Sequence, residues 1–215
     1  MIEKITICDL QNPEVFFPMD RDEFYKEQSE IFKKIGKPSK ACQVVSILFF
    51  TKEKDIILQK RSSHKNHNAN LLDKSVSGHV TFGDSIFYTV MVETIQELKI
   101  PSIILEINED LNKTYELLKD YLDSTAIVKQ IDNKILSSEK IKKGEKILIG
   151  NDLHLFFGIY SGSIKPVDKE ASGVIYYNLD VLKAEMKINP GFFTNDLKFF
   201  LEHYKSEIDE FLASY

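Results

Sequence analysis

Residues 77–100 read SGHVTFGDSIFYTVMVETIQELKI, a loop followed by a helical pattern. The loop ends at Gly78, and Asp84 begins a stretch in which apolar residues recur at helical spacing. The pattern continues to Leu98, and Pro101 ends it because proline cannot continue a helix. The stretch therefore predicts a helix from Asp84 to Leu98 that follows a glycine-containing loop.

Two carboxylates and an amide share one face of this predicted helix. Glu93 and Glu97 lie four residues apart, and Gln96 lies three residues after Glu93. Such a carboxylate pair can hold a hard divalent cation such as Mg²⁺, which leaves positions for phosphate oxygens. A metal held this way polarises a phosphoryl group and activates water. A glutamate pair at this spacing is also common on solvated helix faces, so a purely structural role is the alternative.

The register of this run resembles the Nudix signature G-x5-E-x7-R-E-U-x-E-E-x-G-U, in which U is an aliphatic residue. Gly78, Glu93, Glu97 and Ile100 match it, and Asp84 keeps a shortened carboxylate at the first acidic position. The chain departs from the signature at its arginine, one acid, its final glycine and one aliphatic position, which are Val92, Gln96, Lys99 and Thr94. The Nudix box of this chain is therefore degenerate.

The segment before the box strengthens the resemblance. Residues 56–80, IILQKRSSHKNHNANLLDKSVSGHV, are similar to the same region of Nudix proteins close to isopentenyl-diphosphate isomerase. The positions that fit in order are Lys60, Arg61, Lys65, Asp73, Ser75, Gly78 and His79. The tail at 190–204, PGFFTNDLKFFLEHY, resembles the closing helix of such proteins. The resemblance implies an α/β fold, a Nudix-type α/β/α sandwich with a mixed central sheet.

The length of 215 residues is long for one small domain and short for two. We therefore expect a single Nudix-like domain over 1–215, with an N-terminal extension at 1–38 and an insertion after the Nudix helix at 101–148. Substrate specificity in Nudix proteins lies in loops outside the box. The resemblance places it here in residues 62–73 and in the insertion.

Hydrophobic periodicity predicts the remaining elements. Strands are expected at 2–8, 43–51, 55–60, 74–80, 124–130, 150–161 and 172–177, and further helices at 20–36, 107–122 and 194–215. The lysine-rich stretch 137–146 is expected to be a solvated turn, because acidic residues interleave it. Thr194 or Asn195 is the expected N-cap of the last helix, whose aromatic residues are expected to serve packing.

In Nudix hydrolases the glutamates of the box bind Mg²⁺, and one of them acts with the ion to activate water. By position, the resemblance makes Glu93 and Glu97 the catalytic residues and metal ligands. Gly78 would contribute its carbonyl group, and Gln96 its amide oxygen. Gln96 brings no charge and Val92 cannot orient Glu93 as the family's arginine does, so weakened metal binding is expected. Mg²⁺ or Mn²⁺ is the expected cofactor.

The substrate is expected to meet a cationic rim. Lys60 and Arg61 end a strand and Lys65 follows on the loop, where they can bind a diphosphate; an ordinary charged strand end is the alternative. His79 is expected beside them. Asp152 on a later strand is a candidate for the missing carboxylate, although an exposed turn aspartate is the simpler interpretation.

The resemblance predicts hydrolysis of a diphosphate linkage in a small nucleoside- or organo-diphosphate. A catalytically inactive Nudix-fold binding or regulatory module is the alternative, because a fold can outlast its activity. Isomerase chemistry is disfavoured, since it needs a cysteine before the Gly-His pair, where this chain has Ser77. A serine hydroxyl is a far poorer proton donor than a thiol. Two further isomerase metal-ligand positions fall on Cys42 and Gly150.

Composition narrows the setting and the partners. A net charge of −5 and a pI of about 5.6 give no basic field, so no nucleic-acid partner is expected. Cys8 and Cys42 form neither a disulfide framework nor a metal pair, which favours a reducing compartment. We expect a cytoplasmic protein with no membrane partner, because the sequence shows no signal peptide and no membrane-length apolar run. A small-molecule diphosphate is the expected partner, and a homodimer is an option that the sequence leaves open.

Overall fold

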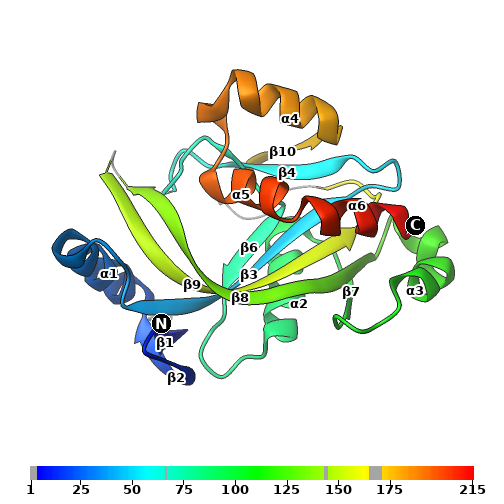
Figure 1. Cartoon of the computed structure of the whole chain (residues 1–215). Coiled ribbons are helices and arrows are strands. Elements are labelled where there is room, and N and C mark those ends of the chain that lie inside the picture. Colours follow the sequence, from blue (N-terminus) through cyan, green and yellow to red (C-terminus); the bar gives the residue numbers. More distant parts are fainter. Residues whose placement is uncertain (1–3, 66, 143–144, 165–170) are drawn as a thin grey trace.

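A mixed β-sheet with helices on both faces forms the centre of the molecule, a computed structural model that describes residues 4–65, 67–142, 145–164 and 171–215 (Figure 1). The main path across the sheet is β10 (Ala171–Tyr177), β4 (Ile56–Arg61), β3 (Lys40–Phe50), β9 (Glu145–Ile159), β8 (Ala126–Lys142) and β7 (Ser102–Leu105). β3 pairs with β9 in parallel, as β7 does with β8, and the other pairs on this path are antiparallel. The predicted mixed central sheet is confirmed.

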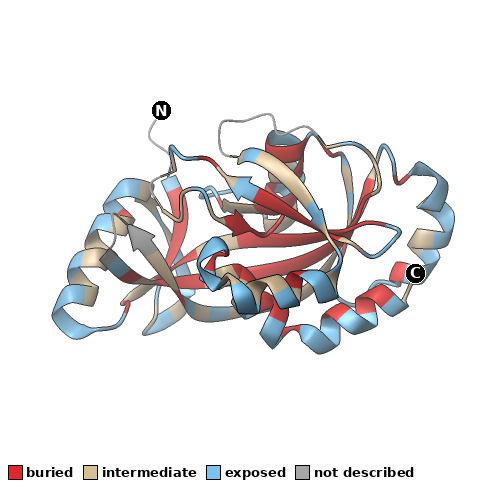
Figure 2. Cartoon of the chain, turned by 90° about the horizontal axis from the view of Figure 1, so that it is seen from above, coloured by how far each residue is buried: buried red, intermediate tan, exposed pale blue. Residues whose placement is uncertain are grey.

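The sheet is buried on both faces because side chains of β3 alternate between two cores. Val45, Ile47 and Phe49 pack in one core with α2 (Ile86–Leu98). Leu48 and Phe50 pack in the other, with α5 (Asn195–His203) and α6 (Lys205–Ala213). Strands buried on both faces read as continuous apolar runs, which β3 does. Figure 2 shows the buried residues gathered on these central strands, between helices that are exposed on their outer sides. The predicted sandwich is therefore confirmed.

Helix α2 begins and ends with local capping interactions. The Ser85 side chain accepts a hydrogen bond from the backbone N–H of Tyr88, so the helix predicted from Asp84 starts two residues later. At the other end Lys99 adopts a left-handed conformation, with φ of 60°, and its N–H bonds the carbonyl of Ile95. Lys99 occupies the glycine position of the Nudix signature, and its backbone still makes the turn that a glycine would favour.

The C-terminal helix predicted over 194–215 is two helices, α5 and α6, with a break at Tyr204. Tyr204 is 1% exposed, and its hydroxyl donates to Oδ2 of Asp132 on β8 at 2.7 Å. This tertiary bond lies at the break, which helical periodicity alone does not reveal. Of the two predicted N-caps, Thr194 is the one whose side chain accepts from Leu197 N.

The N-terminal residues form β1 (Lys4–Asp9), β2 (Asn12–Asp20) and α1 (Arg21–Ile35). β1 and β2 form an antiparallel hairpin that joins the edge of β3, and β2 was not predicted. The helix predicted at 20–36 is confirmed, with Asp20 as its N-cap and Gly36 left-handed at its end. Phe24 of this helix packs with Ile147 and Ile149 of β9 in a third core.

The remaining elements surround the sheet. They are β5 (Leu72–Asp73), β6 (Val76–His79), α3 (Leu111–Leu118), α4 (Leu179–Ile188) and the short 3₁₀ turns Lys119–Tyr121 and Pro190–Phe192. The helix predicted at 107–122 is thus shorter, and α4 was not predicted. Among the described residues, no helix is both long and apolar enough to cross a membrane.

The prediction of a solvated turn at 137–146 is wrong. Strand β8 runs to Lys142 and β9 starts at Glu145, so this stretch forms most of the outer part of a long antiparallel hairpin, which we call the arm (residues 133–142 and 145–154). Ser138 is buried there and accepts a hydrogen bond from Nδ2 of Asn151 at 2.7 Å. Sequence pattern alone does not reveal this strand pairing, because the contacts that stabilise it are distant in sequence. The boundaries of the insertion at 101–148 stay a prediction.

Candidate functional site

A cavity of about 530 Å³ opens between the sheet, α1, α2, the arm and α5. It brings together four residues of the Nudix box, namely Gly78, Glu93, Gln96 and Glu97. Of the residues predicted to bind substrate, Arg61, Lys65 and His79 also line it. Most of the candidate residues from the sequence therefore share one cavity.

The carboxylate of Glu93 lies directly against the backbone of Gly78. A Cβ atom added to Gly78 would stand 1.9 Å from Oε1 of Glu93, a separation that no pair of unbonded atoms tolerates. Gly78 is fixed in place by β6, where it pairs with Val45 of β3. A side chain at position 78 would therefore displace the carboxylate of Glu93, because the helix presents this carboxylate to the strand at contact distance.

Glu97 is 4% exposed, and its Oε2 accepts a hydrogen bond of 2.8 Å from Nε2 of Gln59. Gln59 belongs to β4 and is itself buried. Gln59 is not among the residues predicted from the sequence. The signal available in the sequence is the amide of Gln59 directly after the apolar run IIL at 56–58. A buried amide needs a hydrogen-bond partner, so a glutamine at this place in a strand points to one.

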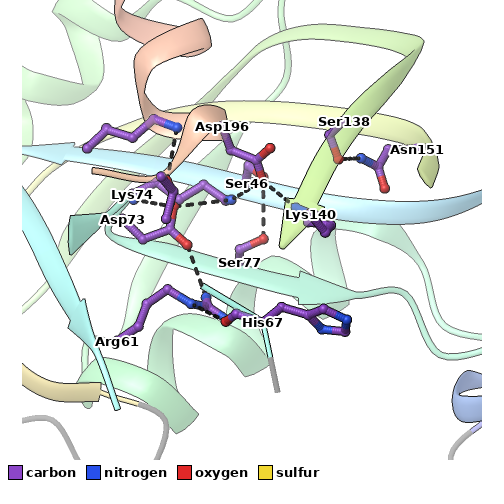
Figure 3. A network of polar contacts seen from close by, with 12 residues as sticks. Ser46, Arg61, His67, Asp73, Lys74, Ser77, Ser138, Lys140, Asn151 and Asp196 are labelled. Atoms are coloured by element: carbon purple, nitrogen blue, oxygen red, sulfur yellow. Dashed lines mark hydrogen bonds and ion pairs between the residues drawn. The ribbon is translucent and has the colours of Figure 1, made fainter. Parts of the chain in front are cut away.

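Arg61 lines the cavity, but all parts of its guanidinium group bond to protein. Nη1 donates to Oδ2 of Asp73 at 3.0 Å, while Nε and Nη2 donate to the carbonyl oxygen of His67 at 3.3 and 3.2 Å. Arg61 thus holds the loop at 62–73 against β5 (Figure 3). Lys60, its neighbour, is exposed and is not among the residues that line the cavity.

Nε2 of His79 forms a hydrogen bond of 3.0 Å with the hydroxyl of Tyr25 on α1. Burial, helped by the positive charge of Arg21, lowers the pKa of His79 to about 3. The imidazole is therefore neutral at pH 7, and it contributes a hydrogen-bonding group without a charge to the cavity. Arg21 and Tyr25 line the cavity as well, so the N-terminal helix is part of this site.

Besides Lys60, two other predicted site residues do not line the cavity. Asp84 is exposed in the turn before α2. Asp152 lies on β9, where its Oδ2 accepts a hydrogen bond of 2.9 Å from Nε2 of Gln43. Burial would raise the pKa of Asp152, but the nearby ring of His154, whose Nε2 lies 3.7 Å from Oδ2, and the hydrogen bond from Gln43 lower it. The carboxylates of Asp84 and Asp152 therefore lie outside the cavity.

The sequence of the chain matches no model of a protein family, and no curated protein sequence matches it either. Solved structures are similar to it. They include DR0079 from Deinococcus radiodurans, with a TM-score of 0.50 and 15% identity, over 73% of this chain and 78% of that one. A NUDIX hydrolase from Nitrosomonas europaea has a TM-score of 0.47 and 12% identity, over 78% of this chain and 90% of that one.

A bifunctional NMN adenylyltransferase/ADP ribose pyrophosphatase from Francisella tularensis has a TM-score of 0.48 and 15% identity, over 87% of this chain. The chain spans about half of that protein, since only 46% of its length is covered. The chain shares its fold with DR0079, and its mixed sheet between helices is consistent with the Nudix fold. At these identities the likeness concerns the fold alone, so activity must be argued from the cavity.

The oxygen atoms in the Nudix box suit a hard divalent ion. Within the described parts of the chain, no group of three or more His, Cys, Asp or Glu residues is arranged to hold a metal. Mg²⁺ needs only one or two protein carboxylates when substrate phosphates and water complete its shell. Glu93 against the backbone of Gly78, with Glu97 and Gln96 in the same cavity, fits that requirement.

The positions that the isomerase would use do not form such a group. The hydroxyl of Ser77 donates to the carbonyl of Val45 at 3.1 Å. Cys42 and Gly150 do not line the cavity, and a Cβ on Gly150 would stand 2.3 Å from the backbone oxygen of Lys40. A glutamate ligand therefore has no room at position 150 in this fold.

Proposed function

We propose that this chain is a Nudix-type hydrolase that cleaves a diphosphate linkage in a small nucleoside- or organo-diphosphate, with Mg²⁺ or Mn²⁺. The observation that carries the proposal is the position of two glutamates. Glu93 touches the backbone of Gly78, and Glu97 is buried with one oxygen bonded to Gln59. Both line a cavity that also contains lysine and arginine side chains.

The residues that would hold the ion are Glu93, Glu97, the amide oxygen of Gln96 and the carbonyl group of Gly78. The bound ion would polarise the phosphoryl group and lower the pKa of a water ligand. The protein contributes orientation. The rigid helix fixes the spacing of the two carboxylates. The side chain of Gln59 donates a hydrogen bond to Glu97 where water would otherwise do so, and this keeps the carboxylate in one orientation.

The charge of the cavity suits a diphosphate once the ion is present. The cavity is lined by as many basic as acidic side chains, which are Arg21, Arg61, Lys65, Lys74 and Lys140 against Asp73, Glu93, Glu97, Glu139 and Asp196. A divalent ion therefore gives the cavity a positive excess. An anionic group of two phosphates would then be attracted to it.

For the substrate we retain Lys65 and His79 as binding residues, because both line the cavity. Lys60 is exposed outside it, and Arg61 serves to hold the loop, so neither is included as a direct contact. Asp84 and Asp152 are not included among the site residues either, because neither lines the cavity.

The experiment is a hydrolysis assay with Mg²⁺ or Mn²⁺ and a panel of nucleoside and prenyl diphosphates, read as phosphate release. We expect Glu97→Gln to lower the rate by about 100-fold or more, because the ion loses one of two charged ligands. Glu210→Gln is the matched control, an exposed residue of α6 outside the cavity. Absence of turnover with every substrate, together with no Mn²⁺ binding by calorimetry, would refute the proposal.

A binding module without catalysis is the second candidate, and Val92 favours it. Val92 stands where the signature has its arginine, so that arginine's contact with the following glutamate is absent. In that case calorimetry would show a diphosphate ligand bound to the protein with Mn²⁺ and no phosphate released. Glu97→Gln would then weaken binding without any change in a rate.

A further inference from the structure

A network of buried charges forms one wall of the cavity, and its two acids are Asp73 at the end of β5 and Asp196 in the first turn of α5. Its three bases come from separate elements. Arg61 ends β4, Lys74 lies between β5 and β6, and Lys140 reaches in from the arm. Figure 3 shows Lys74 and Lys140 both directed toward Asp196.

The contacts of this network are short and little exposed. Asp73 Oδ2 lies 3.0 Å from Nη1 of Arg61, and Asp73 Oδ1 lies 3.6 Å from Nζ of Lys74. Asp196 Oδ2 lies 3.3 Å from Nζ of Lys74 and also contacts Nζ of Lys140. The Lys74 side chain is 5% exposed and its ammonium group lies over the ring of Phe200.

The surroundings of Asp73, Asp196 and Lys74 favour the charged form of each group. Burial alone would raise the pKa of Asp73, but Lys74 and Arg61 hold it well below its usual range. Burial likewise opposes ionisation of Asp196, and Lys140 and Lys74 outweigh it and lower its pKa. Burial would lower the pKa of Lys74, whereas the two aspartates raise it.

Three cations against two carboxylates leave one positive charge in excess. Thr194 adds a neutral hydroxyl that donates to Asp73 at 2.7 Å, which does not change the count. A buried charge without a counterion is costly, and it is usually paired or neutralised. The cavity as a whole is lined by equal numbers of acidic and basic side chains, but this wall has the excess, so an anion that binds at this wall can supply the missing charge.

Lys140 is the member with the most capacity left for such an anion. A lysine ammonium group has three donors. Among the described residues, Nζ of Lys140 makes its hydrogen bond and ion pair with Asp196 alone, and its side chain is 18% exposed on the cavity wall. Lys74 beside it carries a second ammonium group on the same carboxylate.

We propose that Lys74 and Lys140 form an anion subsite that binds a phosphoryl group without the help of a metal ion. The class of ligand is a phosphate ester or diphosphate, because two compact ammonium groups suit a dense, doubly charged anion. The role of this subsite in turnover rests on the proposed hydrolase function. The binding of the anion does not.

The test is calorimetric titration of inorganic pyrophosphate into the full chain in EDTA, so that no divalent ion contributes. We expect binding to the wild-type chain and a dissociation constant about 10-fold higher for Lys140→Gln, since a charge-assisted contact is lost. Lys140→Arg keeps the charge and should restore most of the affinity. Lys129→Gln is the control, a lysine of the same strand that bonds the backbone oxygen of Glu109 and does not line the cavity.

Equal affinity of the wild-type chain and Lys140→Gln for pyrophosphate would overturn the subsite, as would no binding in EDTA. Thermal unfolding shows whether each variant is folded. If Lys140→Gln is not folded, the affinity of Lys140→Arg for pyrophosphate is compared with that of the wild-type chain instead. Malonate, a dicarboxylate, is the second probe, and tighter binding of malonate than of pyrophosphate would contradict the phosphoryl class. The two proposals can fail separately. If Lys140→Gln binds pyrophosphate more weakly but the wild-type chain hydrolyses no diphosphate, the subsite is correct and the proposed hydrolase function is wrong.

Discussion

At Gln59 a single amide connects the sheet to helix α2, which carries Glu93 and Glu97. Its hydrogen bond to Glu97 is made between two buried side chains, so water does not readily replace either partner. In the Nudix signature an arginine orients a glutamate, and this chain has Val92 at that position. We therefore regard Gln59 as a positioning residue that keeps one carboxylate in a fixed orientation.

Gln59→Leu is expected to weaken Mn²⁺ binding and to lower kcat/KM about 10-fold, because partners of metal ligands typically contribute that much. Calorimetry measures the first effect and the hydrolysis assay the second. Gln28→Leu is the control, since Gln28 is also buried but bonds the backbone of Ser39 and Lys40 outside the cavity. Unchanged metal affinity in Gln59→Leu would argue against the positioning role.

Lys99 carries backbone strain that a glycine would not. Its φ of 60° lies in the left-handed region, which costs a residue with a side chain about 1 kcal/mol. We expect Lys99→Gly to raise the free energy of unfolding by about that amount, as measured by urea denaturation. Lys99→Ala keeps a Cβ atom and should give no such gain. A glycine variant less stable than the alanine variant would contradict this account.

The junction of α5 and α6 shows how one contact shapes an element. Tyr204 ends α5, and its hydroxyl bonds Asp132, while Nζ of Lys134 lies 4.5 Å from the centre of its ring. Both partners come from β8, so this strand and the helix break are coupled. The coupling holds α5, with Thr194 and Asp196 at its start, in place beside the cavity.

Tyr204→Phe is expected to lower the free energy of unfolding by about 1 kcal/mol, because it removes a hydrogen bond to a charged but partly exposed partner. Urea denaturation measures the change. Tyr176→Phe is the matched control, since Tyr176 is 45% exposed and its loss of a hydroxyl should have little effect. Equal stability of the two variants would mean that the hydroxyl of Tyr204 does not stabilise the junction.

The molecule as a whole is held together partly by charge. The arm, β5 and α5 are far apart in sequence, and Asp73 and Asp196 bind lysines and an arginine from three elements. Both aspartates have a lowered pKa in the folded state. Their contribution to stability is therefore present above the unfolded pKa of about 4 and is lost as the pH falls below it.

We expect the free energy of unfolding to fall as the pH is lowered from 5 to 3, because the unfolded chain then binds protons that the folded chain excludes. Asp196→Asn should be less stable at pH 7 and lose less on acidification. Urea denaturation at several pH values gives both slopes. Asp209→Asn, an exposed residue of α6, should behave as the wild type. Parallel slopes for Asp196→Asn and wild type would count against the network as a source of stability.

Local pattern determined the framework of this protein. The apolar runs of β3 and β4, the capped helix α1 and the spacing of Glu93 and Glu97 are short-range features, so the sequence predicted them, together with the Nudix-type sandwich. Gly78 was also part of the motif, and the structure shows that a side chain there would displace the carboxylate of Glu93.

Only the tertiary structure decided which side chains share the cavity. Gln59 meets Glu97 across 38 residues of sequence, and Lys140 meets Asp196 across 56. The predicted turn at 137–146 is wrong because the charges of this stretch look solvated in the sequence, whereas α5 packs beside β8 in the fold. Periodicity reports which face of an element is apolar, whereas the partner of a buried charge is chosen by the folding of distant segments together. The box of residues 77–100 thus determined the fold, and packing decided the composition of the site.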